Sequence, residues 1–393
     1  MIAVIADDFT GAAEIGGIGL RYGLDVVIET EDIRNHHADL FIIATDTRSL
    51  CAKEASEHIF RITKEIEKLK PTFIFKKMDS VLRGNIIEEL SAQMKASDKN
   101  RAIIVAANPV FKRIIRDGVY YIDDIPLHKT CFAADPEYPI NSSSVLSIIG
   151  ASQDISVINL KPDEELPESG LIIGDATSSD DLEKWTSRID EKTLIAGASG
   201  FFGALLAKQC SIQPAIEAPF FPYGQNSLYV LGSTFPKNFD FIKKLQESSY
   251  FLSNMPQEIY NNKNFDPSFL EFWVNDIVQG IRRHQKVAVS VVHSPSNDPE
   301  ITKRIKVIMG ELIKRVTDKI EINELIIEGG STTCVILEYL NMKKLFPIHE
   351  LDTGVIRMKI DGWPNLYLTT KPGSYYWPDS FWQPSDILQT NNT

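Results

Sequence analysis

Short apolar segments alternate with amphipathic segments along most of this chain. The apolar segments are near-continuous runs of Val, Ile and Phe, which are typical of strands in a parallel sheet covered on both faces. In the first half, strands are expected at residues 1–6, 25–29, 39–44, 72–76, 101–106, 155–160, 171–174 and 193–196. Helices are expected after Gly11, at 52–69 and 84–95, from residue 179, and at 199–208, and a hairpin-like excursion at 117–127.

The same alternation restarts in the second half. Strands are expected at residues 228–231, 287–292, 324–327, 356–360 and 366–369, and helices at 236–247, 267–284, 299–316 and 331–340. Residues 211–225 contain three prolines and show no period, as an interdomain linker does. We therefore predict an α/β protein with two domains, 1–210 and 227–393, joined by a linker at 211–226. Each domain would be a mostly parallel sheet flanked by helices, with a ligand cleft between them.

Composition argues against several classes of protein. The chain has 393 residues and a net charge of −12, whereas a nucleic-acid-binding protein usually carries a basic face. No apolar run approaches the roughly 18 residues of a membrane helix, and no signal peptide is expected. The histidines show no metal-ligand spacing, so no metal-binding motif is predicted. The cysteines lie far apart and are expected to be buried free thiols in a reducing cytoplasm: Cys51, Cys131, Cys210 and Cys334.

The first predicted strand ends in two adjacent carboxylates. Asp7 and Asp8 are followed by Phe9, Thr10 and Gly11 before a helical pattern begins. In open α/β sheets, ligands bind at the carboxyl ends of the strands. Two carboxylates there can hold hydroxyl groups, accept a proton or bind a metal. The structural alternative is that Asp8 or Thr10 only caps the helix.

A second polar cluster lies between the strand predicted at 72–76 and the next helix. It contains two lysines, an acid, a hydroxyl, an arginine and an amide: Lys76, Lys77, Asp79, Ser80, Arg83 and Asn85. Arginine binds a carboxylate through two parallel hydrogen bonds, and the other groups can bind sugar hydroxyls. The cluster therefore fits a small anionic, hydroxylated ligand, and Arg48 after the third predicted strand is a weaker candidate. The alternative is a charged loop in which Asp79 caps the helix.

Two glycine-containing turns follow predicted strands in the second half. Their residues are Gly232 and Ser233 in one turn, and Gly329, Gly330, Ser331 and Thr332 in the other. Glycine lets the backbone approach a ligand, and N–H groups at a helix N-terminus attract phosphate. A nucleotide could bridge two such turns at one sheet edge, although ordinary strand–helix turns share the pattern. The Walker A motif is absent.

Two rival chemistries fit less well. Gly17, Gly19 and Gly23 do not complete the Gly-x-Gly-x-x-Gly fingerprint and lie inside the predicted helix, which disfavours a nicotinamide dehydrogenase. An aspartyl phosphatase usually has Asp-x-Asp, and Phe9 occupies the third position here.

Together, these segments resemble the four-carbon acid sugar kinases, which phosphorylate threonate, erythronate or 3-oxo-tetronate at the terminal hydroxyl. Residues 6–12, Ala-Asp-Asp-Phe-Thr-Gly-Ala, are similar to the family's Ala-Asp-Asp-Leu-Thr-Gly-Ala. Residues 77–85, Lys-Met-Asp-Ser-Val-Leu-Arg-Gly-Asn, are similar to its Lys-x-Asp-Ser-Thr-Leu-Arg-Gly-Asn. Residues 108–111 with Arg113 resemble its stretch ahead of a hairpin, and the resemblance covers nearly the whole chain.

The resemblance implies an N-terminal acid-sugar-binding domain, a C-terminal nucleotide-binding domain, and phosphoryl transfer from ATP with Mg²⁺ in the cleft between them. The acid sugar would be bound by Asp7, Arg48, Lys77, Ser80, Arg83, Asn85 and Arg113. ATP would be bound by Ser233, Gly329, Gly330, Ser331, Thr332 and Gly373. Asp8 is the first candidate for the carboxylate that orients the accepting hydroxyl and takes its proton, and Asp79 is the second.

The sequence departs from the family in three places. Lys112 stands where the family usually has glycine, and Phe9 and Val81 replace common Leu and Thr. Residues 371–376 read Lys-Pro-Gly-Ser-Tyr-Tyr in place of Lys-Ser-Gly-Asn-Phe-Gly. The acid could therefore differ from the family's usual substrates. The alternative function is a non-catalytic sugar-acid-binding protein with a degenerate nucleotide site. A homo-oligomer is compatible with the sequence, and no nucleic-acid or membrane partner is expected.

Overall fold

The computed structural model describes residues 1–31, 33, 37–135, 138–209, 224–232, 250–291, 299–373 and 375–378. Contacts divide the chain into two compact units, Met1–Ile216 and Glu217–Thr393. The dividing point falls within the linker predicted at 211–226. That linker lies outside the described residues except for 224–226, and the helix predicted at 236–247 lies outside them entirely. The cleft expected between the domains stays a prediction.

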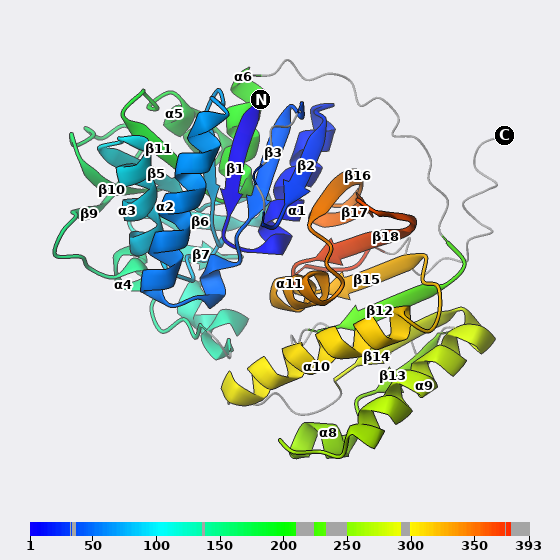
Figure 1. The fold of residues 1–393 in the computed structure, drawn as a ribbon. Helices are drawn as coiled ribbons and strands as arrows, with labels where there is room; N and C mark the ends of the chain where they lie inside the picture. Colours follow the sequence, from blue (N-terminus) through cyan, green and yellow to red (C-terminus); the bar gives the residue numbers. More distant parts are fainter. Residues whose placement is uncertain are drawn as a thin grey trace. The chain divides into compact units, whose positions relative to one another are not determined.

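The first unit is built on a parallel sheet, coloured blue to green in Figure 1. Its strand order is β2-β3-β1-β4-β11-β5-β10-β9, and every neighbouring pair is parallel. Most of these strands are buried along their whole length, which explains their continuous apolar sequences. The strands are β1 (Ile2–Ala6), β2 (Val26–Glu29), β3 (Leu40–Ala44), β4 (Ile74–Lys77), β5 (Arg101–Val105), β9 (Val157–Leu160), β10 (Gly170–Gly174) and β11 (Thr193–Gly197).

Helices cover both faces of this sheet. They are α1 (Phe9–Arg21), α2 (Ala52–Lys68), α3 (Ile86–Ser97), α4 (Val145–Ile149), α5 (Ser179–Thr186) and α6 (Ser199–Gln209). Ile59, Ile62 and Ile66 of α2 recur at helical spacing and pack on one face of β1 and β3. On the other face, Phe75 of β4 packs against Phe202 of α6, with ring centroids 5.1 Å apart. The predicted α/β architecture is therefore confirmed for this unit.

A small antiparallel sheet replaces the simple hairpin predicted at 117–127. It consists of β6 (Arg113–Arg116), β7 (Val119–Ile122) and β8 (Ile125–Pro126). The prediction started too late, because the first strand comes before the Asp117–Gly118 turn. Both turn residues have positive φ angles, 50° and 71°. Among the described residues, the same unit contains short 3-10 turns at η1 (Thr47–Ser49), η2 (Pro109–Phe111), η3 (Leu127–Lys129) and η4 (Cys131–Ala134).

The second unit has a sheet of order β13-β14-β12-β15-β18-β17-β16, coloured green to red in Figure 1. Neighbouring strands are parallel as far as β18, and the last two strands join antiparallel. The sequence missed β13 and β16, since both mix polar and apolar residues. The elements are β12 (Ser227–Leu231), β13 (Phe251–Asn254), α8 (Gln257–Asn261), α9 (Pro267–His284), β14 (Lys286–Ser290), α10 (Pro299–Thr317), β15 (Glu324–Glu328), α11 (Gly330–Tyr339), β16 (Lys344–Asp352), β17 (Val355–Ile360) and β18 (Trp363–Lys371).

The cysteines differ from the sequence-based expectation. Cys51, Cys131 and Cys334 are free, but Cys51 and Cys131 are exposed, so the prediction of burial is wrong for these two. Both lie in connecting segments, where a small residue need not enter the core. Cys210 lies outside the described residues. No helix in the described ranges is both long enough and apolar enough to span a membrane.

Candidate functional site

The carboxyl ends of β3, β1 and β4 bring the two polar clusters of the first unit together. These strands are adjacent and parallel, so the residues that follow them meet at one edge of the sheet. Arg48 lies in η1 beyond β3, Asp7 and Asp8 follow β1, and Lys77 and Asp79 end or follow β4. We call these five residues the polar edge.

Arg48 is the centre of the polar edge. Its Nε and Nη2 donate hydrogen bonds to Asp7 Oδ2 at 3.0 and 2.9 Å. Its Nη1 donates to Asp8 Oδ2 at 3.0 Å and lies 3.6 Å from Asp79 Oδ1. Burial alone would lower the pKa of Arg48, but the three carboxylates outweigh it and raise that pKa well above its ordinary value. Arg48, the weaker candidate in the sequence, therefore bonds to two carboxylates and lies close to a third.

Asp8 caps helix α1 and also faces the cations of the polar edge. Its Oδ1 accepts from the backbone N–H of Gly11 at 2.7 Å, and its Oδ2 accepts from Thr10 Oγ1 at 2.9 Å. Burial raises the pKa of Asp8, but Arg48 and Lys77 outweigh burial and hold it below its ordinary value. A Cβ at Gly11 would lie 2.6 Å from Asp8 Oδ1, so a side chain here would displace the Asp8 carboxylate from its present position. The capping role is real and leaves the carboxylate charged.

The two oxygens of the Asp7 carboxylate have different surroundings. Its Oδ2 accepts from Arg48 and from the backbone N–H of Asp79 at 3.2 Å. Within the described part of the chain, its buried Oδ1 has no hydrogen-bond partner. Burial raises the pKa of Asp7 despite the Arg48 charge. The adjacent carboxylates Asp7 and Asp8 therefore have their pKa values shifted in opposite directions.

Asp79 and Arg83 form a bidentate pair. Arg83 Nε donates to Asp79 Oδ2 and Nη2 donates to Oδ1, both at 2.8 Å. The backbone N–H groups of Val81 and Arg83 also donate to Asp79 Oδ2, at 3.2 and 3.1 Å. Burial opposes ionisation of Asp79, but Arg83 and Arg48 outweigh it and lower the pKa of this carboxyl far below its ordinary value. Both Asp79 oxygens are thus occupied by protein donors.

The remaining sequence-predicted residues of the first unit make contacts within the protein. Arg113 Nη1 donates to Ser80 Oγ. Asn85 Nδ2 donates to the carbonyl oxygens of Thr47 at 3.1 Å and Leu50 at 2.9 Å, so it fixes the η1 turn that carries Arg48. Ser80 and Asn85 are half-buried, and Arg113 is buried. Asn85 is thus in a position to hold Arg48 in place.

A chain of contacts that the sequence analysis missed continues the polar edge toward β11 and β5. The Lys77 ammonium lies 3.7 Å from Glu14 Oε2. Ser199 Oγ donates to Glu14 Oε1 at 2.9 Å, and Asn108 Nδ2 donates to Ser199 Oγ at 3.2 Å. Glu14 carries a visible signal, since it is the one charged residue among apolar and glycine residues in the stretch 11–20.

The glycine turn of the second unit begins helix α11. Gly329 has a φ angle of 97°, which favours glycine, and it directly precedes the helix. A Cβ at Gly232, after β12, would lie 2.2 Å from Thr332 Oγ1, so the two turns touch. The first N–H groups of a helix have no partner inside the helix and attract anions. Gly330 and Ser331 stand at that position, whereas Ser233 lies outside the described residues.

A buried ion pair lies beside this turn. Glu328 ends β15 and Lys371 ends β18, and Lys371 Nζ lies 3.0 Å from Glu328 Oε2. Trp377 Nε1 donates to the same oxygen at 3.0 Å. Over the described residues, the buried Glu328 Oε1 has no hydrogen-bond partner. Glu328 was not among the site residues predicted from the sequence, although a charged residue that ends an apolar run before Gly329 was a usable signal. Gly373 follows this pair and is half-buried.

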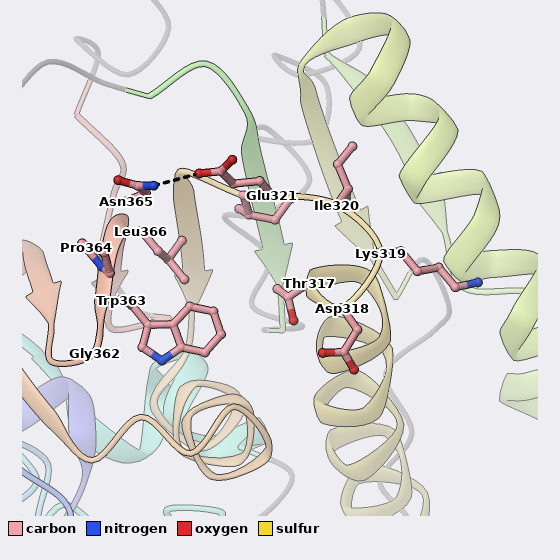
Figure 2. Close-up of a pocket in the computed structure, with 11 residues that line it drawn as sticks. Thr317, Asp318, Lys319, Ile320, Glu321, Gly362, Trp363, Pro364, Asn365 and Leu366 are labelled. Atoms are coloured by element: carbon pink, nitrogen blue, oxygen red, sulfur yellow. Dashed lines mark hydrogen bonds between the residues drawn. The ribbon is translucent and has the colours of Figure 1, made fainter.

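An open cavity of about 480 Å³ lies at the opposite end of the second sheet. It is lined by residues 317–322, at and just after the end of α10, and by residues 362–366, around the start of β18. Figure 2 shows the Trp363 ring at this cavity and the 3.1 Å hydrogen bond from Asn365 Nδ2 to Glu321 Oε1. Because Gly329 and Lys371 lie at the other ends of their strands, this cavity is separate from the predicted nucleotide turn.

Comparison with known proteins gives a family match over the first unit. The model of a sugar-binding N-terminal domain matches residues 2–205. A D-threonate kinase from Salmonella typhimurium is 30% identical over 221 residues, which are 51% of this chain and 52% of that protein. A D-erythronate kinase from Heliobacterium modesticaldum is 31% identical over 162 residues, 40% of this chain and 37% of that protein. The chain thus matches about half or less of the length of these curated relatives.

Matches over the full length are weaker in sequence. A 3-oxo-tetronate kinase from Actinobacillus succinogenes is 23% identical over 97% of this chain and 98% of that protein. A solved structure of a Haemophilus influenzae protein covers 96% of this chain and 98% of its own with a TM-score of 0.69 and 19% identity. A Salmonella typhimurium structure covers 97% of both chains with a TM-score of 0.74 and 18% identity. These structures support the fold.

Proposed function

Because the chain belongs to the family that carries this sugar-binding N-terminal domain, we propose that it is an ATP-dependent kinase of a small sugar acid. The acceptor would be the terminal hydroxyl of a four-carbon acid such as threonate, erythronate or 3-oxo-tetronate. The polar edge is the observation that carries this proposal. Both motifs behind the family resemblance converge there, in a buried cluster of three acids with Arg48 and Lys77.

The proposal assigns the acid sugar to the first unit. Oxygen atoms of Asp7 and Asp8 suit sugar hydroxyls, because carboxylates accept hydrogen bonds from several donors. Arg83 and Lys77 supply positive charge for the substrate carboxylate. Arg48, Asn85 and Ser80 are already bonded within the protein, so their part is to hold the polar edge in shape.

The proposal assigns ATP to the glycine turn of the second unit. Gly330, Ser331 and Thr332 place backbone N–H groups at the start of α11, where phosphate is favoured. Gly329, whose own N–H donates to the Lys371 carbonyl oxygen at 3.1 Å, shapes the turn through its positive φ angle. Ser233 and Gly373 belong to the same predicted set. Use of ATP also fits the cytoplasmic location expected from the sequence.

Mg²⁺ is part of the proposed reaction, and the second unit offers one fitting donor. Magnesium prefers carboxylate oxygens and is often bound by only one or two of them, together with substrate phosphates. Glu328 Oε1 is buried without a hydrogen-bond partner among the described residues, directly before Gly329. No group of three or more acidic, His or Cys side chains suited to a metal occurs in the described ranges. Glu328 would therefore hold the ion, which neutralises phosphate charge when bound.

Asp8 is the proposed proton acceptor. Phosphoryl transfer depends mainly on alignment and charge neutralisation, and a carboxylate beside the accepting hydroxyl aligns it and takes its proton. The side chain of Asp8 is 13% exposed and that of Asp79 is 6% exposed. Both oxygens of Asp79 accept from Arg83 and the backbone, which favours a positioning role for Asp79.

An ADP-release assay tests the proposal. Purified protein, MgATP and each of D-threonate, D-erythronate and 3-oxo-tetronate should give acid-dependent ADP release, with a phosphorylated acid identified by mass spectrometry. Calorimetry with each acid in the absence of ATP is the companion measurement. Acid binding without turnover of any of the acids would favour the non-catalytic sugar-acid-binding protein instead.

A further inference from the structure

Glu328 is a buried acid whose two carboxylate oxygens have different surroundings. Oε2 lies 3.0 Å from the Lys371 ammonium and accepts a hydrogen bond from Trp377 Nε1 at 3.0 Å. Oε1 is buried as well, and it has no hydrogen-bond partner in the part of the chain that the structure describes. A buried polar atom without a partner is costly and rare in native proteins, so it indicates that another group binds there.

Lys371 is held beside Glu328 by the pairing of two strands. β15 and β18 are parallel, and Glu328 stands opposite Lys371 in their register. The Lys371 ammonium also donates to the carbonyl oxygen of Pro372 at 3.2 Å. Lys371 therefore balances the charge of Glu328 at Oε2, and its contact leaves Oε1 without a partner.

Trp377 approaches Glu328 from the segment that follows β18. Its ring belongs to a buried apolar cluster that also contains Ile326 of β15 and Val355 of β17. The Lys371 ammonium lies 5.1 Å from the centroid of the same ring. Because the cluster anchors the ring, the indole N–H is held in a defined position next to Glu328 Oε2.

We propose that Trp377 is a positioning residue, whose indole N–H holds Glu328 by Oε2 so that Oε1 stays available to the Mg²⁺ that accompanies ATP. This inference rests on the proposed function, because it concerns the metal that the kinase would use. Groups that hydrogen-bond a metal-binding carboxylate fix its orientation. An indole N–H suits this task, since it is a donor only and brings no positive charge that would repel the cation.

The affinity of Trp377→Phe for the non-hydrolysable analogue β,γ-imido-ATP, measured by calorimetry, tests the proposal. Phenylalanine keeps an aromatic ring in the apolar cluster but has no N–H for Glu328. In excess Mg²⁺, the dissociation constant of the analogue should rise by about 10- to 100-fold, as is typical when the support of a metal ligand is lost. In EDTA, the variant and the wild type should bind the analogue equally. An equal loss in both conditions, or no loss in either, would show that Trp377 only packs in the core.

Trp363→Phe is the matched control. Trp363 is the first residue of β18 and lies at the separate cavity shown in Figure 2, whereas Lys371 is the last residue of the same strand. This control should bind the analogue as the wild type does in both conditions. Trp377→Leu is the second variant without a donor and should lose affinity in Mg²⁺ only. If neither Trp377 variant folds, Trp377 belongs to the scaffold and the inference is wrong.

The ADP-release assay separates this inference from the proposed function. Turnover by the wild type without a Mg²⁺-specific loss in the Trp377 variants rejects the positioning role and keeps the kinase. A Mg²⁺-specific loss in the variants without turnover of any acid by the wild type keeps the positioning role and rejects the kinase. Absence of analogue binding by the wild type in Mg²⁺ rejects the positioning role, and turnover then decides the kinase separately.

Discussion

The carboxyl edges of the two sheets are built from different groups. In the first unit, charged side chains dominate, and Arg48 alone contacts Asp7 and Asp8 and approaches Asp79. In the second unit, the glycine turn presents backbone N–H groups at the start of α11, beside the buried ion pair of Glu328 and Lys371. The edge of the first sheet therefore depends on ion pairs between side chains. The edge of the second sheet depends on backbone N–H groups that a ligand can approach closely.

This difference predicts how each edge tolerates change. Charged side chains can discriminate hydroxyl from carboxylate and one stereoisomer from another, but removal of one charge leaves its partners buried and uncompensated. Backbone N–H groups bind any phosphate of suitable geometry, and they are lost only when a side chain blocks the approach. Substitutions should thus act on stability and acid binding in the first unit, and on ATP binding in the second.

The largest effect is expected for Asp8→Asn. Asparagine is an equally good helix cap, so the fold should persist while the proton acceptor is lost. General-base assistance typically contributes about 10²–10⁴-fold, and kcat should fall within that range while both substrates still bind. Steady-state kinetics with calorimetry measures both quantities.

Asp79→Asn is the companion variant for Asp8. Since Asp79 is bonded to Arg83 on both oxygens, its change should act mainly on the KM for the acid. Normal turnover in Asp8→Asn with lost turnover in Asp79→Asn would exchange the two roles. Normal turnover in both would leave Asp8 as a helix cap only.

Arg48→Ala should cause the largest loss of stability. It leaves Asp7, Asp8 and Asp79 without their shared cation in a site where the Arg48 side chain is only 14% exposed. Breaking a buried ion pair in this way costs about 3–5 kcal/mol, which urea unfolding measures. Lys68→Ala is the control, because the side chains of Lys68 and its partner Glu65 are 67% and 46% exposed and such pairs contribute about 1 kcal/mol or less. Equal losses in both variants would contradict the central role of Arg48.

The position of most polar-edge residues at one end of the sheet could be predicted, because neighbouring parallel strands have their carboxyl ends on the same side. Asp7, Asp8, Lys77 and Asp79 follow buried apolar runs, and that pattern is local in sequence. The partners from distant segments could not be predicted in the same way. Asp135 lies 52 residues from Arg83 in the chain, in a segment without period, and only the folded backbone brings the two together.

The same limit applies to strands and to the choice among cations. β16 contains Pro347 and several half-buried positions, so its sequence lacks the apolar run that revealed the central strands, and its pairing with β17 defines it. In the sequence, Arg48 was the weaker candidate because a single arginine in a short turn does not form a recognisable motif. Its importance comes from three acids that separate strand ends place around it.

Gly330→Val tests the glycine turn of the second unit as the ATP site. A branched side chain at the first residue of α11 would occupy the space where phosphate must approach the N–H groups. Forcing extra methyl groups into a fitted site costs about 1–3 kcal/mol, so ATP affinity should fall by roughly 5- to 150-fold with acid binding kept. Gly203→Val on helix α6 is the control, since a Cβ there has no atom within 4 Å. Unchanged ATP affinity in a folded Gly330→Val protein would show that the nucleotide binds elsewhere.

Acidification should destabilise the first unit by protonating Asp79 of the polar edge. Burial raises the pKa of Asp79, but Arg83 and Arg48 outweigh burial, so this pKa is lower in the folded state than in the unfolded state. The resulting stabilisation is fully present above the unfolded value of about 3.9 and is lost as pH falls through the folded pKa. The difference in unfolding free energy between wild type and Asp79→Asn should therefore stay constant from about pH 5 to 7 and shrink below about pH 4. A difference that grows on acidification would show that folding raises the pKa of Asp79, contrary to this prediction.

The smallest effect is expected for Asn85→Ala, and it decides whether Asn85 binds substrate or positions Arg48. Its amide nitrogen donates to the carbonyls of Thr47 and Leu50 on either side of Arg48. Loss of two hydrogen bonds of this kind costs about 1–2 kcal/mol of stability.

If Asn85 acts by positioning, the KM for every tested acid should rise by a similar small factor, because the whole η1 turn loosens. Direct recognition of one substrate hydroxyl predicts a different result: D-threonate and D-erythronate, which differ at one hydroxyl-bearing centre, should be affected unequally. Asn85→Asp extends the test, since its carboxylate keeps the size but cannot donate to the two carbonyls. Equal losses for both acids in both variants would assign Asn85 to the support of Arg48, and unequal losses would return it to the substrate-binding set.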